Sequence, residues 1–244
     1  NVDRGVGRMV DVLKQSGQLD NTLILFLSDN GAAPNGGFVP SNNGFGFSPN
    51  SSNNTWRKDG VAIRPGSGPK LMPGPHDTFA GYGLAWALTS NTPLRNAKMS
   101  AYEGGIRTPL IAHWPKVIKK GNGLTRQPGH VIDLMATCLD LADQEYPAEF
   151  QNRRPIPVEG KSLAPILRGE QRAGHETLAW KNASGRALMM GDWKIVRPGD
   201  KRPWELYDLS SDPGETTNLA KQHPARVKDM ADRYETWRQR VGAR

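Results

Sequence analysis

Apolar positions in the first 28 residues follow two different patterns. In residues 2–14 they recur with the spacing of one helix face: Val2, Val6, Met9, Val10 and Leu13. Gly17 suits the end of this helix. Residues 22–28 instead form a continuous apolar run, which is typical of a buried parallel strand. A helix that leads into such a strand indicates half of a crossover unit. Asp29 then follows the strand, at the edge where open α/β sheets bind ligands.

A long polar stretch interrupts this pattern. Asn, Gly, Ser and Pro occupy 16 of the 20 positions in residues 35–54, a composition that cannot form a packed core. We expect a loop that continues to about residue 76, and a loop of this length inside a compact domain is often functional. After it, an apolar run at residues 110–114 predicts a second strand. Residues 131–142 predict a helix, and Cys138 lies on its apolar stripe, where we expect it to be buried.

The last third of the chain predicts a small α+β subdomain. The polar, proline-containing residues 145–160 suggest a boundary, so we divide the chain into residues 1–150 and 151–244. Residues 187–197 predict a hairpin that turns at Gly191, and residues 204–209 predict a third strand. A closing helix over residues 224–241 carries one apolar face: Val227, Met230, Ala231, Tyr234, Trp237 and Val241.

Composition narrows the classes of function. A length of 244 residues suits one large domain, or one domain with a small second one. No apolar run approaches 18 residues, which excludes a membrane-spanning helix. The single cysteine excludes an internal disulfide and a cysteine-cluster metal site. The net charge of +8 is spread, with no run of basic residues longer than two, and this argues against nucleic acid as a partner.

Two short segments carry candidate chemistry. Asp29 and Asn30, followed by Gly31, place a carboxylate beside a carboxamide, and such oxygen ligands suit Ca²⁺ or Mg²⁺ better than zinc. Asp-Asn-Gly is also an ordinary turn sequence, so both readings stay open. Lys98 is a compact cation that could hold an oxyanion, or an ordinary surface lysine. The glycines after Glu103 suggest a backbone packed tightly beneath a site.

Taken in order, these motifs resemble the type I, formylglycine-dependent sulfatase family, and bacterial arylsulfatases in particular. The resemblance rests on several stretches in series: residues 21–31, 81–115, 160–169, 191–196, 204–209 and 212–219. It implies an alkaline-phosphatase-like α/β fold, a mixed sheet flanked by helices with a small C-terminal α+β subdomain. It implies hydrolysis of sulfate esters, of a small molecule or a sulfated carbohydrate. It further implies that Asp29 and Asn30 bind one Ca²⁺, with Mg²⁺ possible, and that Lys98 contacts the sulfate as a catalytic and substrate-binding residue.

The sequence departs from the family at the nucleophile. It has no Cys/Ser-x-Pro-x-Arg motif, and Cys138 is followed by Leu-Asp-Leu, so it is not the formylglycine precursor. We expect this motif and the remaining metal ligands upstream of residue 1. The chain is then a C-terminal portion, inactive alone, whose strand at residues 22–28 lacks sheet partners. The resemblance also implies export to the periplasm or outside the cell, with a cytoplasmic location left open.

Two alternatives remain from the sequence. One is a phosphonate or phosphodiester hydrolase of the alkaline phosphatase superfamily. Asn30 speaks against it, because the related two-metal enzymes typically carry a histidine at that position, and asparagine is a poorer zinc ligand. The other is an inactive truncated fragment with at most a binding or scaffold role. The oligomeric state is left open.

Overall fold

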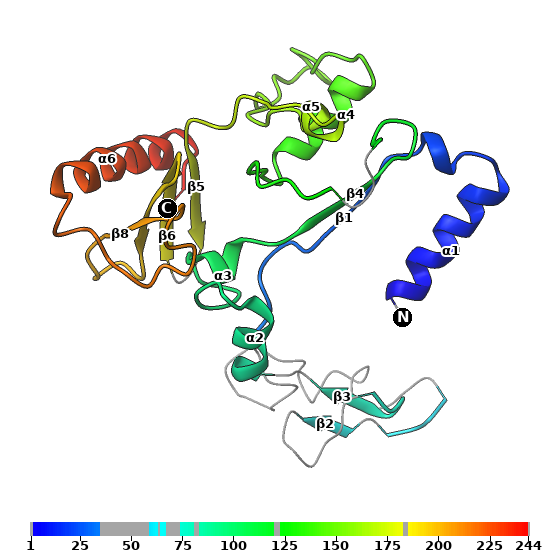
Figure 1. Ribbon diagram of the computed structural model, residues 1–244, viewed down its shortest axis with the longest axis horizontal. Coiled ribbons are helices and arrows are strands. Elements are labelled where there is room, and N and C mark those ends of the chain that lie inside the picture. The colour runs from blue at the N-terminus through cyan, green and yellow to red at the C-terminus, as the bar shows by residue number, and fades with distance from the viewer. Residues whose placement is uncertain are drawn as a thin grey trace. The chain divides into compact units, whose positions relative to one another are not determined.

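The computed structural model describes residues 2–34, 59–62, 64–66, 74–80, 83–119, 123–182 and 185–243 (Figure 1). The chain divides into two compact units, each made of two stretches. The first unit is Asn1–Asp29 with Pro109–Glu176, and the second is Asn30–Thr108 with Thr177–Arg244. Most of the predicted loop over residues 35–76 lies outside the described residues. No helix in the described ranges is both long and apolar enough to cross a membrane.

In its described residues the first unit holds four helical segments and a two-stranded sheet. Its elements are α1 (Val2–Gln15), a 3-10 turn (Leu19–Asn21), β1 (Ile24–Leu27), β4 (Leu110–His113), α4 (Asp133–Leu141) and α5 (Ala164–Leu167). Helix α1 confirms the periodicity of residues 2–14, and it ends before Gly17, which has a φ of 68°. Strands β1 and β4 confirm the two predicted strands.

The pairing of β1 differs from the prediction. Strand β1 runs antiparallel to β4, with Ile24 opposite His113 and Leu27 opposite Leu110, so a parallel arrangement was wrong for this pair. Within the described ranges this sheet contains no third strand. Apolar side chains on it stay exposed, Phe26 at 48% and Ile111 at 59%. The expected burial of the apolar run is therefore absent. The expectation that this strand lacks sheet partners was wrong in that β4 pairs with it, although apolar surface stays uncovered as expected.

Helix α4 buries a polar face instead of the predicted apolar stripe. Cys138 is exposed, whereas Asp133 and Thr137 are fully buried. The Asp133 carboxylate accepts hydrogen bonds from the backbone N–H of Lys161 at 2.9 Å and from the Arg172 guanidinium at 2.8 Å. Burial alone would raise the pKa of Asp133, but these donors outweigh burial and hold the pKa below its ordinary value. Bonding to residues far along the chain thus decides which face of α4 is buried, and Cys138 was wrongly placed.

The second unit contains the C-terminal sheet and the segments near the candidate site. Its elements are β2 (Arg64–Gly66), β3 (Thr78–Ala80), α2 (Gly83–Asn91), α3 (Glu103–Ile106), β5 (Leu178–Asn182), β6 (Gly185–Met190), β7 (Trp193–Arg197), β8 (Glu205–Asp208) and α6 (Pro224–Arg240). Strands β5 to β8 form an antiparallel sheet in sequence order. The hairpin at Gly191, the strand β8 and the helix α6 confirm the predictions, whereas β5 had no prediction. Strand β2, which lies within the range predicted to be loop, pairs in parallel with β3, which follows that range.

Successive side chains of a strand point to opposite sides of the sheet. Both faces of the four-stranded sheet are covered by other parts of the same unit. Helix α6 lies across one face of the strands (Figure 1). Its side chains Met230 and Tyr234 pack into the core on that face. Their partners in the sheet are Leu188, Ile195 and Leu206. Val241, the last residue of the predicted stripe, is 44% exposed and takes no part.

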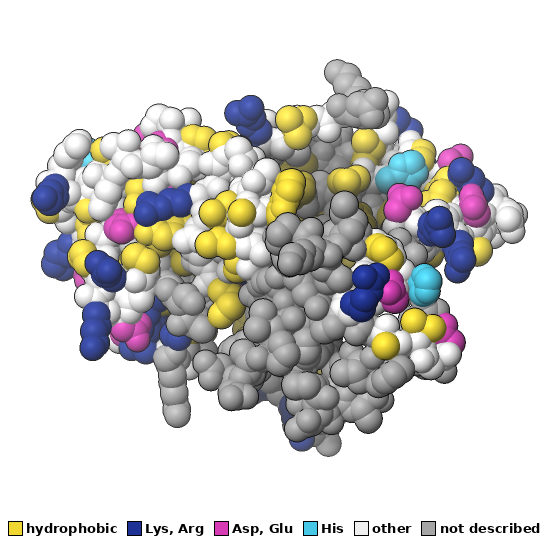
Figure 2. Space-filling view, turned by 90° about the horizontal axis from the view of Figure 1, so that it is seen from below, with side chains coloured by type: hydrophobic (Ala, Val, Ile, Leu, Met, Phe, Trp, Pro, Cys, Tyr) yellow, Lys and Arg dark blue, Asp and Glu magenta, His cyan; other side chains and the backbone are white. Residues whose placement is uncertain are grey.

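The opposite face of this sheet packs against the segment that follows Lys98. Ala187, Val196 and Tyr207 form one cluster there with Ala101 and Tyr102. The C-terminal sheet therefore serves as the platform for residues 101–102. Elsewhere on the surface, basic and acidic side chains are interspersed over the face that Figure 2 shows, in keeping with the scattered basic residues of the sequence.

Candidate functional site

The turn after β1 depends on a glycine that contacts α3. Asp29 is exposed, Asn30 is half-buried and Gly31 is buried. The Gly31 N–H donates to the carbonyl of Gly105 at 3.0 Å. A Cβ atom at Gly31 would lie 1.8 Å from the carbonyl oxygen of Gly104, a distance that no side chain tolerates. Glycine is therefore required where the chain leaves the Asp-Asn pair.

The two glycines of α3 are packed just as closely on their other side. A Cβ at Gly104 would lie 2.3 Å from the carbonyl oxygen of Asn96, and one at Gly105 would lie 2.2 Å from that of Ser100. These contacts confirm the predicted close packing of the backbone. As a result α3 stands between the segment that begins at Gly31 and the loop that carries Lys98.

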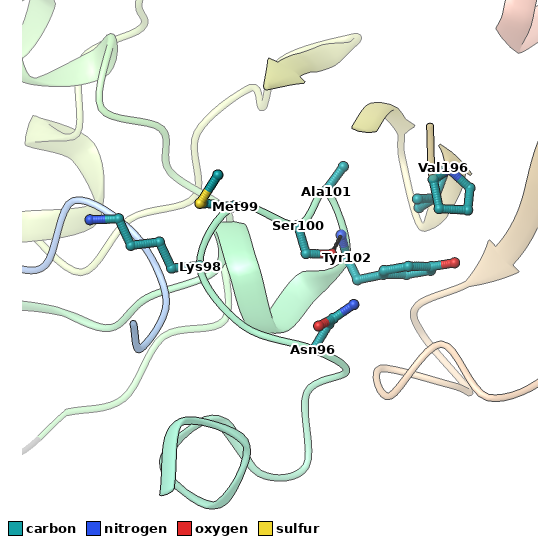
Figure 3. Close-up of a pocket in the computed structure, with 8 residues that line it drawn as sticks. Asn96, Lys98, Met99, Ser100, Ala101, Tyr102 and Val196 are labelled. Carbon is teal, nitrogen blue, oxygen red and sulfur yellow. Dashed lines mark hydrogen bonds between the residues drawn. The ribbon is translucent and has the colours of Figure 1, made fainter. Parts of the chain in front are cut away.

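Lys98 is held by the backbone that follows the Asp-Asn pair. Its N–H donates to the carbonyl of Ala32 at 3.0 Å. Its side chain is exposed and, in Figure 3, extends away from Tyr102 and Val196. The structure thus brings the backbone of residues 31–32 to that of Lys98, 66 positions later in the chain as counted from Ala32.

The loop around Lys98 has an unusual backbone and borders a cavity. Asn96 and Met99, on either side of Lys98, have φ angles of 71° and 75°, in the left-handed region that non-glycine residues rarely adopt. A cavity of about 210 Å³ is lined by Asn96, by residues 98–102 and by Val196 and Pro198 (Figure 3). A small, partly polar cavity therefore adjoins the loop that carries Lys98.

The oxygen ligands at the turn are of the type that a hard cation prefers, but there are too few of them to complete its coordination. Asp29 and Asn30 offer a carboxylate and a carboxamide oxygen, which Ca²⁺ and Mg²⁺ prefer. Ca²⁺ takes about six to eight oxygen ligands. Among the residues that the structure describes, no group of three or more His, Cys, Asp or Glu is placed to hold a metal ion. This pair can thus supply only part of a calcium site.

A buried ion-pair network that the sequence did not reveal fixes α3 on the sheet. The Lys194 ammonium, fully buried on β7, lies 2.7 Å from the Glu103 carboxylate and 2.8 Å from that of Glu215. Glu215 also accepts the backbone N–H of Glu103 at 2.6 Å. Nothing in the local sequence around Lys194 or Glu215 marks either side chain as buried or as a partner of Glu103.

Next to this network, two tyrosines share one carboxylate. The hydroxyls of Tyr102 and Tyr207 donate to the same oxygen of Glu205, at 2.5 and 2.6 Å. Burial and this carboxylate raise the pKa of both tyrosines, so both remain protonated donors. The Arg95 guanidinium lies 4.1 Å from the centre of the Tyr102 ring and donates to the Tyr207 hydroxyl at 2.9 Å. These contacts anchor the Arg95–Lys98 loop to the C-terminal sheet.

Comparison with known proteins gives two matches to family models and a consistent set of relatives. Residues 1–144 match the model described as Sulfatase, and residues 96–240 match that described as N-sulphoglucosamine sulphohydrolase, C-terminal. An uncharacterized sulfatase of Schizosaccharomyces pombe is 32% identical over 247 residues, with 99% of this chain and 42% of that protein covered. An N-acetylgalactosamine-6-O-sulfatase of Bacteroides thetaiotaomicron is 27% identical over 255 residues, with 96% and 40% covered. The chain thus spans about two fifths of the length of these relatives.

Solved structures share the fold. Ps i-CgsB in complex with k-i-k-neocarrahexaose aligns with a TM-score of 0.63 at 24% identity, over 97% of this chain and 40% of that one. A phosphonate monoester hydrolase from Silicibacter pomeroyi aligns with a TM-score of 0.54 at 22% identity, over 98% of this chain and 39% of that one. These likenesses confirm the predicted fold class, a partial alkaline-phosphatase-like arrangement. Because hydrolases of different esters share it, the fold alone does not choose the ester.

Proposed function

The chain belongs to the sulfatase family, whose model matches more than half of it, and we propose that the complete protein hydrolyses sulfate esters. One observation carries the proposal. The backbone next to the Asp29–Asn30 pair is hydrogen-bonded to that of Lys98, at 3.0 Å between the Lys98 nitrogen and the Ala32 oxygen. Two segments with chemistry suited to an anionic ester are thus held together by the fold.

In this proposal the Asp29–Asn30 pair and Lys98 have different tasks. Asp29 and Asn30 would supply two oxygen ligands to one Ca²⁺, with Mg²⁺ as the second choice. When bound, such an ion supplies Lewis-acid stabilisation to a sulfate oxygen. The Lys98 ammonium would contact another sulfate oxygen and offset negative charge that develops during cleavage. Gly31 and α3 keep the turn and the lysine loop in register.

The nucleophile is the part of the proposal that this sequence does not supply. The family resemblance implies a formylglycine, and the sequence contains no Cys/Ser-x-Pro-x-Arg motif from which it could form. Cys138 is exposed on α4, and the residues that follow it, Leu-Asp-Leu, do not form the motif. We therefore propose that a segment outside residues 1–244 provides the nucleophile, and that residues 1–244 alone do not turn over a sulfate ester.

Relatives support a carbohydrate as the organic part of the substrate. One of them is an N-acetylgalactosamine-6-O-sulfatase, and one solved structure of the same fold holds a neocarrahexaose.

Three further points belong to this proposal. We place the complete protein in the periplasm or outside the cell, and bacterial members among the relatives are consistent with this location. The division near residue 150 into a catalytic portion and a C-terminal subdomain remains our proposal. A phosphonate or phosphodiester hydrolase is the second candidate, which the likeness to a phosphonate monoester hydrolase favours.

The two candidates differ in the ester they prefer. We expect the complete protein to hydrolyse an aryl sulfate with kcat/KM at least about tenfold above that for the matching aryl phosphonate monoester, since Asn30 suits a single hard cation. The measurement is the rate at which the same phenol is released from both esters. Residues 1–244 alone serve as the control, which we expect to be inactive. A preference for the phosphonate ester would replace this proposal by the second candidate.

A further inference from the structure

The carboxamide of Asn91, the last residue of α2, joins two backbone segments of the candidate site. Its oxygen accepts the N–H of Ala32 at 3.0 Å, and its nitrogen donates to the carbonyl of Asn96 at 2.9 Å. Ala32 follows the Asp29–Asn30–Gly31 turn, and Asn96 lies two residues before Lys98. One side chain is therefore bonded both to the segment that follows the Asp29–Asn30 pair and to the loop that carries Lys98.

These bonds, together with one from Lys98, link Ala32 to both Asn91 and the lysine loop. The Ala32 N–H is bound by Asn91, and the Ala32 carbonyl accepts the N–H of Lys98 at 3.0 Å. Asn91 returns to the lysine loop through the carbonyl of Asn96. The role requires a side chain that accepts and donates at once, and the carboxamide of asparagine does both through its oxygen and its nitrogen. Aspartate could accept from Ala32 but could not donate to Asn96.

The lysine loop needs such support because its backbone is not relaxed. Asn96 has a φ of 71° and Met99 a φ of 75°. Conformations of this kind persist only where the surroundings fix them. The bond from Asn91 to the Asn96 carbonyl, and the bond from the Ala97 N–H to the Asn96 side chain at 3.1 Å, fix the first of them.

We propose that Asn91 is a positioning residue of this site, which holds the Lys98 loop in register with the turn that carries Asp29 and Asn30. The proposal rests on the proposed function for its catalytic consequence, but its structural consequence is independent. If Asn91 is lost, the bonds that hold Ala32 and Lys98 open more often, and Lys98 is less often in place for the transition state. The effect therefore falls on kcat more than on KM.

The test uses Asn91→Ala and Asn91→Asp in the complete protein, with Thr89→Ala as the matched control. Thr89 is exposed on the same helix, and its hydroxyl donates to the carbonyl of Ala85 within α2. We expect kcat for the ester that the wild type prefers to fall by about 10- to 100-fold in both Asn91 variants, with KM changed less than about threefold. Thr89→Ala should leave both constants unchanged.

Amide hydrogen exchange supplies a second measurement that does not depend on activity. The Ala32 and Lys98 amides should exchange at least about tenfold faster in Asn91→Ala, while Asn91→Asp should keep the Ala32 amide protected and speed up only that of Lys98. Unchanged exchange in Asn91→Ala would overturn the proposal, as would a lower melting temperature with unchanged kcat. A wild type that cleaves only phosphonate esters would overturn the proposed function, and Asn91 would still be judged by these two measurements.

Discussion

Replacing Lys98 by alanine in the complete protein is expected to lower kcat for a sulfate ester by about 10²- to 10³-fold, the usual loss when one preorganised charge or donor at a reacting oxygen is removed. The backbone of Lys98 is fixed by Ala32, so truncation of its exposed side chain removes a charge without removing the bond that holds the loop. The measurement is steady-state kinetics with an aryl sulfate, alongside a melting curve to confirm that the variant folds.

Two variants sharpen this expectation. Lys98→Arg keeps the positive charge but replaces the compact ammonium by a planar guanidinium, so we expect it to recover only part of kcat. Lys221→Ala removes an exposed lysine elsewhere in the same unit and should leave kcat unchanged. A Lys98→Ala protein with wild-type kcat would show that Lys98 is a surface lysine and not part of the site.

Replacing Lys194 by methionine should lower the free energy of unfolding by about 3–5 kcal/mol, because it removes the cation beside the fully buried Glu215 carboxylate and leaves Glu103 with the longer Arg107 contact at 3.6 Å. The side chains of Lys194 and Glu215 are 0% exposed and that of Glu103 is 7% exposed. Urea unfolding of the complete protein at pH 7 measures the loss. Lys228→Met is the matched control, since Lys228 pairs with Asp232 on the surface of α6, and we expect no measurable change there.

The loss in Lys194→Met should also depend on pH. Burial raises the pKa of Glu215 above its ordinary value even beside Lys194, and removal of the lysine raises it further. A carboxyl group with a raised pKa binds a proton in the folded protein that the unfolded chain releases, so the stability of the variant falls as pH rises. The deficit should therefore be largest near neutral pH and shrink towards pH 4. A deficit that equals that of Lys228→Met at every pH would contradict the buried network.

Elements whose signal is local were predicted well from the sequence. The apolar period of residues 2–14 produced α1, and the turn at Gly191 produced the β6–β7 hairpin. The pairing of β1 was not predictable from its own residues, because an apolar run does not specify the direction of its partner. Cys138 was misplaced for a similar reason. The buried face of α4 is set by bonds from Asp133 to Lys161 and Arg172, which periodicity does not detect.

The motif residues of the candidate site could be predicted from the sequence. The residues that hold those motif segments in place could not. Asp29, Asn30 and Lys98 stand in short, ordered motifs, and the structure shows the backbone pairing between their segments. Lys194 and Glu215 lie 91 and 112 residues from Glu103 along the chain, so only the fold brings them together. The bonding role of Asn91 cannot be predicted from the sequence, because a carboxamide at the end of a helix has many ordinary uses and its two partners lie in different segments.

The most direct test of the central claim, that the Asp29–Asn30 pair belongs to the metal site of a sulfatase, is the calcium dependence of aryl sulfate turnover by the complete protein. We expect that removal of divalent ions with a chelator abolishes turnover and that Ca²⁺ restores it. We also expect that Asn30→Ala requires at least about tenfold more Ca²⁺ for half-maximal activity than the wild type. Turnover that persists in chelator, or an Asn30→Ala protein with a wild-type calcium requirement, would contradict that claim.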